Sequence, residues 1–301
     1  PGEVLVETHW LSMDPLPRVR MDPAAKFPPP LPLGSVVVGR GVGVVRASAH
    51  EGFGAGDWVA GELGWQELAL VPGAALRRVD PELAPVQTAL GVLGPSGVTA
   101  WCLVHVAAAV RAGEHVVVAA AAGSVGSVAV QLAKLAGARV VGIVGGERQA
   151  RFVRDELGAD AVVDYRSATL DADLAQALPA GANVFLDSVG GALHGAVMQR
   201  IADHARIVAF GFISAYNSGA DAQPEYGRIY ELIRRRATLQ GFLVGDHAAR
   251  FGEATAALAD HLRAGRLRNA ESVTTGFEQT PAAFARLFDA DPVGKQLVRV
   301  R

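Results

Sequence analysis

Short apolar strands alternate with helical segments through the middle of the chain, and this alternation restricts the possible folds more than any other feature. Six runs have the length and composition of buried strands: His115–Ala119, Arg139–Ile143, Ala161–Asp164, Val184–Asp187, Arg206–Phe210 and Leu239–Val244. Apolar residues at helical spacing lie between them, as in Val125–Ala136 and Arg148–Leu157. Nearly continuous apolar strands between helices indicate a parallel sheet covered on both faces. This pattern predicts an α/β domain with a doubly wound Rossmann sheet.

The flanking parts of the chain have a β-rich pattern instead. Val4–Thr8 alternates apolar and polar residues, and Gly294–Arg301 alternates again. Further strands are expected at four places: Val36–Gly39, Gly43–Arg46, Asp57–Ala60 and Gln66–Val71. We therefore expect two domains: a β-rich one formed by residues 1–93 and 266–301, and a Rossmann domain of residues 94–265 inserted into it. The last strand is expected to return to the first domain.

The bulk composition excludes several classes of protein. Hydrophobic residues make up 50% of the 301 positions and charged residues 19%, which is ordinary for a folded protein. The formal net charge of −2 gives no basic field for nucleic acid. The single cysteine, Cys102, excludes an internal disulfide. No apolar run reaches the roughly 18 residues of a membrane span and no signal peptide is recognised, so we expect a cytoplasmic protein without a membrane segment.

A glycine-containing turn lies between the first parallel strand and the helix after it. Its sequence is Ala121-Ala122-Gly123-Ser124-Val125-Gly126. Gly123 allows a tight turn, and the N–H groups of Ser124, Val125 and Gly126 are expected to converge with the positive end of the helix dipole. Such a place binds the diphosphate of a dinucleotide. A close-packed turn without a ligand is the alternative, since the usual first glycine is replaced by Ala121.

The end of the second parallel strand indicates which dinucleotide is bound. About 20 residues after the glycine turn, an NAD enzyme places Asp or Glu against the ribose hydroxyls. This chain has Gly145 and Gly146 there, followed by Arg148 and Arg151. The glycines leave space and two guanidinium groups can pair with a 2′-phosphate, so the pattern favours NADP(H). Glu147 could bind the ribose instead, which keeps NAD as the alternative.

Motifs along nearly the whole chain match one known family in order. They include Trp10–Pro15, Gly64–Glu67, Leu157–Asp160, Asp187–Gly191, Gly211–Asn217 and the pair Gly294-Lys295. On these residues the chain resembles the zinc-independent medium-chain dehydrogenases/reductases of the leukotriene B4 dehydrogenase, prostaglandin reductase and alkenal double-bond reductase type. The resemblance implies a Rossmann domain inserted into a GroES-like domain, often in a homodimer. It also implies NADPH-dependent reduction of a carbon–carbon double bond conjugated to a carbonyl, in a small enone or related substrate.

The resemblance also assigns site residues. NADP contacts map onto Gly123 to Gly126 and onto five further positions: Gln149, Tyr165, Ser188, Phe212 and Ile213. The candidate donors to the substrate carbonyl are Tyr216 and Tyr230. The family usually has lysine at position 149 and asparagine at position 188, so this chain departs at both.

Other departures lie near the expected active site. Leu16 stands where the family usually has tyrosine, and Pro95 with Ser96 where it has Met-Pro. Pro292 stands where an asparagine usually meets the nicotinamide half of the cofactor. The family's first strands have no counterpart at the start of this chain. Two alternatives therefore stay open: a quinone reductase of the same superfamily, and a catalytically weak NADP-binding protein.

No metal site is expected from the sequence. A catalytic zinc needs three protein ligands from Cys, His, Asp or Glu. Cys102 lies among apolar residues, the histidines form no i, i+4 pair near an acid, and four of them are isolated in helices or at strand starts: His105, His115, His194 and His204.

Overall fold

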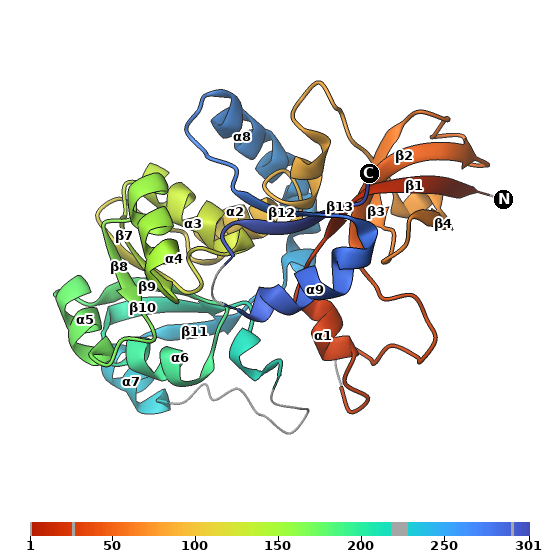
Figure 1. Ribbon diagram of the computed structural model, residues 1–301. Coiled ribbons are helices and arrows are strands. Elements are labelled where there is room, and N and C mark those ends of the chain that lie inside the picture. Colours follow the sequence, from red (N-terminus) through yellow and green to blue (C-terminus); the bar gives the residue numbers. More distant parts are fainter. Residues whose placement is uncertain (1, 26–27, 218–227, 290–291) are drawn as a thin grey trace. The chain divides into compact units, whose positions relative to one another are not determined.

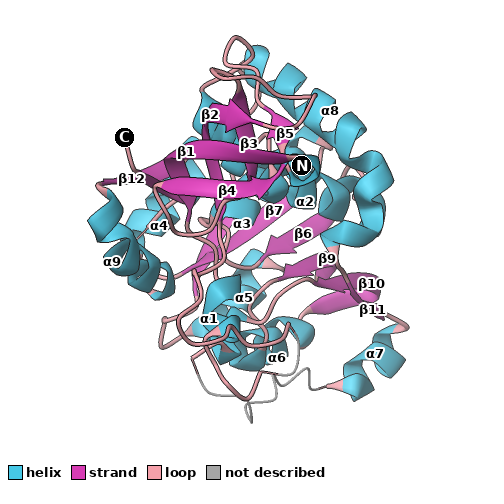
Figure 2. Ribbon diagram, turned by 90° about the vertical axis from the view of Figure 1, so that its right-hand side faces the viewer, coloured by secondary structure: helices cyan, strands magenta, loops and turns pink. Residues whose placement is uncertain are grey.

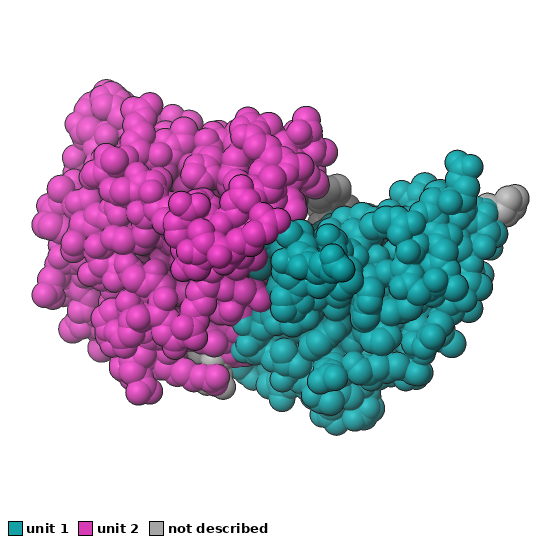
Figure 3. All heavy atoms as spheres, turned by 90° about the horizontal axis from the view of Figure 1, so that it is seen from above, with its two compact units in different colours: residues 1–95, 271–289, 295–301 teal, residues 96–270, 290–294 magenta. Residues whose placement is uncertain are grey.

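The computed structural model describes residues 2–25, 28–217, 228–289 and 292–301. The chain divides into two compact units (Figure 3). Unit 1 consists of Pro1–Pro95, Glu271–Asp289 and Lys295–Arg301, and unit 2 of Ser96–Ala270 and Ala290–Gly294. Unit 2 is thus inserted between stretches of unit 1.

The described part of unit 2 contains a six-stranded sheet in the order β11-β10-β9-β6-β7-β8, and every neighbouring pair is parallel (Figure 1). Its strands are β6 (His115–Val118), β7 (Arg139–Val144), β8 (Ala161–Asp164), β9 (Ala182–Asp187), β10 (Ile201–Ala209) and β11 (Thr238–Gly241). The chain winds outward from β6 in one direction through β7 and β8, and then in the other direction from β9. This order confirms the predicted Rossmann sheet and puts its switch point between β6 and β9.

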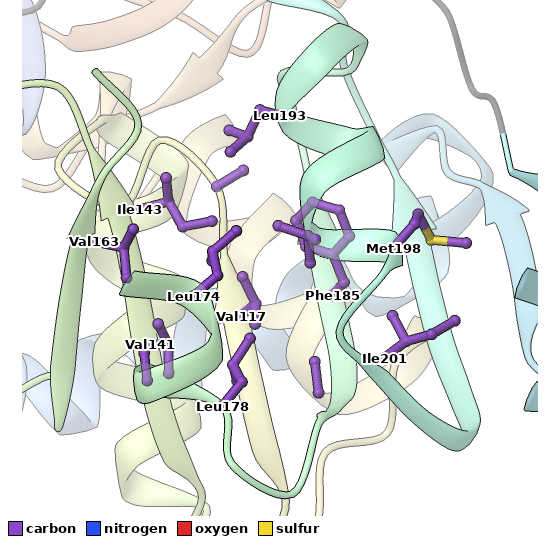
Figure 4. Close-up of a cluster of buried hydrophobic side chains, with 14 of the residues drawn as sticks. Val117, Val141, Ile143, Val163, Leu174, Leu178, Phe185, Leu193, Met198 and Ile201 are labelled. Atoms are coloured by element: carbon purple, nitrogen blue, oxygen red, sulfur yellow. The ribbon is translucent and has the colours of Figure 1, made fainter. Parts of the chain in front are cut away.

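Helices cover both faces of this sheet (Figure 1). They are α2 (Pro95–Cys102), α3 (Ser124–Leu135), α4 (Glu147–Arg151), α5 (Leu170–Ala177), α6 (Gly191–Met198), α7 (Ile229–Arg235) and α8 (Phe251–Arg263). Figure 4 shows the core of one face, where Val117, Ile143 and Phe185 of the strands pack against Leu174 of α5 and Leu193 of α6. Burying these side chains contributes about 1.5–3 kcal/mol each, which holds the strand ends in fixed positions.

Unit 1 is built on a mixed sheet (Figure 2). Its described strands follow the order β12-β13-β1-β2-β3-β5, and β4 also pairs with β1. The bounds are β1 (Glu3–Ser12), β2 (Arg40–Ser48), β3 (Trp58–Glu62), β4 (Leu68–Pro72), β5 (Arg77–Arg78), β12 (Glu271–Thr275) and β13 (Lys295–Arg299), with helices α1 (Leu16–Arg20) and α9 (Thr280–Ala285). Leu11 of β1 lies opposite Val298 of β13 in an antiparallel pair, so the predicted return of the last strand is confirmed.

Two strand assignments differ from the sequence pattern. The strand expected at Val36–Gly39 is wrong, because this segment forms only separate hydrogen bonds, from Trp65 N–H to the Val37 carbonyl and from Gly64 N–H to the Gly39 carbonyl. The pattern also misses β12, which is largely polar and whose side chains are half-buried or exposed. Its pairing with β13 comes from the tertiary fold.

Candidate functional site

The glycine turn follows β6 at the switch point of the parallel sheet. A Cβ atom added at Gly126 would lie 2.2 Å from the carbonyl oxygen of Ala120. Glycine at this position therefore allows α3 to begin directly against the turn. Gly123 precedes the helix in an extended conformation and donates its own N–H to the Ala120 carbonyl at 2.9 Å. The local geometry is thus that of a strand leading into a close-packed helix.

The first turn of α3 can receive an anion. Within the described residues, the N–H groups of Ser124, Val125 and Gly126 donate to no protein acceptor. The turn contains no acidic residue and no side-chain cap. The helix α3 that follows is 12 residues long. Unpaired donors and the helix dipole both favour a bound anion, so these residues fit the diphosphate of a dinucleotide. The Ser124 hydroxyl is hydrogen-bonded to the Ser96 hydroxyl at 2.6 Å.

The turn after β7 is formed by two successive glycines, Gly145 and Gly146. Gly146 has a φ of 113°, a conformation that favours glycine. The Gly145 N–H donates to Gln149 Oε1 at 3.1 Å, and Gln149 Nε2 donates to the Pro292 carbonyl at 2.9 Å. The side-chain amide of Gln149 is therefore engaged at both ends, where the family usually has a flexible lysine.

A segment far along the sequence lies beside the glycine turn. The Gly294 N–H donates to the Ala122 carbonyl at 2.7 Å, and Gly294 forms a parallel bridge with Gly123. Together with the bond from Gln149, this places residues 292–294 between the turns that follow β6 and β7. Sequence reasoning missed this arrangement because the expected Rossmann domain ended at residue 265.

Arginine side chains approach the turn after β7 from two elements, α4 and the segment after β8. Arg148 and Arg151 lie on α4, and Arg151 Nε is 3.6 Å from Glu147 Oε1 with both side chains more than 60% exposed. Tyr165 directly follows β8, where its N–H donates to the Val144 carbonyl at 3.0 Å. Tyr165 is 44% exposed, and the guanidinium carbon of Arg166 lies over its ring, 5.6 Å from the centroid. Arg166 was not among the residues predicted from the sequence.

The loop after β9 is held by a buried, hydrogen-bonded pair of side chains, Asp187 and His194. Asp187 Oδ1 accepts the N–H groups of Val189 and Gly190 at 2.8 and 3.0 Å, and its Oδ2 is 2.9 Å from His194 Nδ1. Both side chains are fully buried. The interpretation of His194 as an isolated residue is therefore wrong, because the first turn of α6 brings its ring back to Asp187 at the end of β9. The half-buried Ser188 lies in this loop.

The loops after β9 and β10 are joined to each other. The Ser188 carbonyl accepts the Ile213 N–H at 3.1 Å, and the Ser214 hydroxyl donates to the Val189 carbonyl at 2.5 Å. Phe212 and Ile213 thus lie beside Ser188 at the carboxyl ends of the strands. This is the edge of an open α/β sheet at which ligands bind.

The two candidate tyrosines have unequal surroundings. Tyr216 is half-buried, and its ring packs edge-on against Phe212 with 5.0 Å between centroids. Burial raises the pKa of the Tyr216 phenol, which keeps it a neutral hydrogen-bond donor at neutral pH. Tyr230, in the first turn of α7, has a 70% exposed side chain.

The described residues contain neither a metal-binding cluster nor a helix that could span a membrane. Among residues whose positions are described, no group of three or more His, Cys, Asp or Glu side chains could hold a metal ion. Cys102 is buried, and burial raises the pKa of its thiol. None of the helices in those same residues is long and apolar enough to cross a membrane.

Comparisons with known proteins match this chain along nearly its whole length. Family models described as an N-terminal domain of oxidoreductase and as a zinc-binding dehydrogenase match residues 1–79 and 124–260. A putative NADP-dependent oxidoreductase of Bacillus subtilis, YfmJ, is 40% identical over 99% of this chain and 88% of its own length. The NADPH-dependent curcumin reductase of Escherichia coli is 34% identical with the same coverage. The fold is also similar to the crystal structure of CurA from Vibrio vulnificus in complex with NADPH. The two structures superpose with a TM-score of 0.93 and 34% identity, over 100% of this chain and 90% of the CurA chain.

The fold and these relatives define the chain as a dinucleotide-dependent oxidoreductase. Its similarity extends over nearly every residue and includes both units. The chain belongs to the family of zinc-independent medium-chain dehydrogenases/reductases that includes the curcumin, alkenal and prostaglandin reductases.

Proposed function

We propose that this protein uses NADPH to reduce the carbon–carbon double bond of an α,β-unsaturated ketone or aldehyde. The observation that carries the proposal is the acid-free first turn of α3, with three main-chain donors that no described acceptor uses. It occurs in a chain whose near full-length relatives include an NADPH-dependent curcumin reductase and a 2-alkenal reductase. An anion site of this kind at a Rossmann switch point supports binding of the cofactor diphosphate.

The residues around the carboxyl edge of the sheet would hold the cofactor. Ser124, Val125 and Gly126 would bind the diphosphate through their N–H groups, and Gly123 would allow its close approach. The adenosine ribose would lie over the turn after β7, near Gly145, Gly146, Arg148, Gln149 and Arg151, with Tyr165 beside it. Ser188, Phe212 and Ile213 would contact the remainder. The absence of an acid at positions 145 and 146 supports NADP(H) over NAD.

The chemistry asks the protein chiefly for positioning and one hydrogen-bond donor. When bound, NADPH supplies a hydride to the β-carbon of the substrate. Negative charge then develops on the carbonyl oxygen, where a neutral phenol can donate a hydrogen bond. Tyr216 is the candidate that its burial and raised pKa support, and Tyr230 is the second candidate. A proton from water or a hydroxyl completes the reaction at the α-carbon.

The proposal is tested by following NADPH oxidation with a panel of enones, alkenals and quinones. Mass spectrometry of the products should show gain of two hydrogens across the conjugated double bond, with the carbonyl intact. Faster turnover of quinones than of every enone would instead identify a quinone reductase. Tight NADPH binding without turnover of any acceptor would identify a catalytically weak binding protein.

The proposal includes a homodimer in the cytoplasm. β11 lies at one edge of the described parallel sheet, and two exposed apolar residues flank it in the sequence, Ile233, which is 71% exposed, and Leu243, which is 62% exposed. An unpaired strand edge with apolar neighbours favours pairing with a second copy. Light scattering of the purified protein measures the oligomeric state.

A cytoplasmic location suits an enzyme that draws on the cell's NADPH.

A further inference from the structure

Arg166 reaches across the turn that follows β7. If a Cβ atom were present at Gly146, it would lie 4.0 Å from the Arg166 Nη1 atom. The guanidinium also lies over the Tyr165 ring, 5.6 Å from its centroid. The backbone of Arg166 is fixed by a hydrogen bond from its N–H to Asp164 Oδ1 at 2.9 Å. A cation from the segment after β8 therefore stands beside Gly146, in the turn between β7 and α4.

The charge of Arg166 is not neutralised by the protein. In the portion of the chain that the structure covers, Arg166 forms no ion pair with a carboxylate, and its side chain is exposed. The neighbouring polar groups are engaged differently. Arg151 lies near Glu147, and Gln149 uses both ends of its amide within the protein. Of these three side chains, Arg166 is the one that best suits an anion above Gly146.

We propose that Arg166 determines the cofactor specificity of the protein by binding the 2′-phosphate of the adenosine half of NADPH. This inference rests on the proposed function. A guanidinium presents a planar set of donors that matches phosphate oxygens, and the Tyr165 ring supports the cation from below. In this chain Arg166 takes the task for which Gln149 lacks the charge, and the Gln149 amide is held in place by its bonds to the Gly145 N–H and the Pro292 carbonyl.

The test uses the full chain and two small probes that differ in the phosphate of interest. Calorimetry measures binding of 2′,5′-ADP, which carries the 2′-phosphate, and of 5′-AMP, which lacks it. For Arg166→Gln we expect an affinity for 2′,5′-ADP lowered about 10- to 100-fold, from the loss of a charge-assisted hydrogen bond. The affinity for 5′-AMP should be unchanged. Arg166→Lys should restore part of the loss, since it keeps the charge without the planar donors.

A matched control is Arg154→Gln, because Arg154, in the helical segment that continues α4, is also exposed but pairs with Asp155 at 3.0 Å. This variant should bind both probes as the unchanged protein does. Thermal unfolding of each variant checks that it is folded. The same shift should appear in kinetics, as a fall in kcat/KM for NADPH with that for NADH unchanged.

The outcomes separate the inference from the function on which it rests. If the unchanged protein binds 2′,5′-ADP more tightly than 5′-AMP and Arg166→Gln keeps that preference, the inference is overturned while the reductase function stands. Loss of the preference only in Arg148→Gln or Arg151→Gln overturns it equally. If the unchanged protein neither prefers 2′,5′-ADP nor oxidises NADPH, the proposed function itself has failed.

Discussion

His194 and Asp187 form a fully buried pair, with Nδ1 of the imidazole 2.9 Å from Oδ2 of the carboxylate. The other carboxylate oxygen accepts two main-chain N–H groups of the loop after β9. The pair therefore sets the shape of the loop that carries Ser188, although neither side chain is exposed to a ligand.

Replacing His194 tests the contribution of this pair. His194→Leu leaves Oδ2 of the buried Asp187 side chain without its imidazole partner, so we expect the free energy of unfolding to fall by about 1–3 kcal/mol. His194→Gln retains a donor and should lose less. Urea denaturation monitored by circular dichroism measures both. Equal stability of the leucine variant and the unchanged protein would contradict this role.

Gly126→Ala tests the close approach of α3 to the glycine turn. The new methyl group would lie 2.2 Å from the Ala120 carbonyl oxygen, so the start of the helix must move. We expect NADPH affinity to fall at least about tenfold, because the main-chain donors leave their positions. Gly252→Ala in α8 is the control, since its methyl group would meet nothing within 4 Å. It should keep the affinity and gain up to about 1 kcal/mol in stability.

Tyr216→Phe tests the hydrogen-bond donor. Loss of one donor to the developing oxyanion lowers kcat by about 100- to 1000-fold in comparable sites, with little change in the KM for NADPH. Tyr230→Phe should have the smaller effect, because its side chain is 70% exposed. Steady-state kinetics on an enone that the enzyme reduces gives both numbers. A larger loss of kcat in Tyr230→Phe would exchange the two roles.

The raised pKa of Tyr216 also predicts a pH dependence. The phenol is the donor in its protonated form, and burial raises its pKa above the ordinary value of 10.0. The contribution of this hydrogen bond to kcat should therefore persist through neutral and mildly alkaline pH. The ratio of kcat between the unchanged protein and Tyr216→Phe should stay constant up to about pH 10. A ratio that declines between pH 7 and 9 would argue against a neutral phenol as donor.

Asp160 predicts a second pH dependence, this time of stability. Burial alone raises the pKa of Asp160, but the Lys134 ammonium at 2.8 Å and the Val140 N–H at 2.7 Å outweigh it, and the net pKa lies below the ordinary 3.8. The folded state therefore binds the proton less readily than the unfolded chain. The stabilisation is fully present above the unfolded pKa and is lost as pH falls through the folded one.

The measurement is urea unfolding at a series of pH values, comparing the unchanged protein with Asp160→Asn. The difference between them should be constant above about pH 5 and should shrink below about pH 4. A difference that grows as pH falls would have the wrong sign.

The sequence predicted the parallel sheet because its strands are apolar throughout, and burial on both faces requires that composition. The glycine turn was equally visible, since a helix can begin against the Ala120 carbonyl only if residue 126 lacks a side chain. Contacts between separate elements were not predictable in this way. The position of Arg166 over Gly146 depends on how β8 pairs with β7, and no local periodicity encodes it. β12 escaped notice because a half-exposed edge strand carries polar residues.

The bonds from residues 292–294 to the turns after β6 and β7 have a consequence for biosynthesis. Residues 96–270 are translated before residues 292–294. The strands of the Rossmann sheet can therefore form while the turns after β6 and β7 still lack their contacts with Gly294 and Pro292. The nascent protein would then bind the nucleotide firmly only after residues 292–294 have been translated and have reached the two turns.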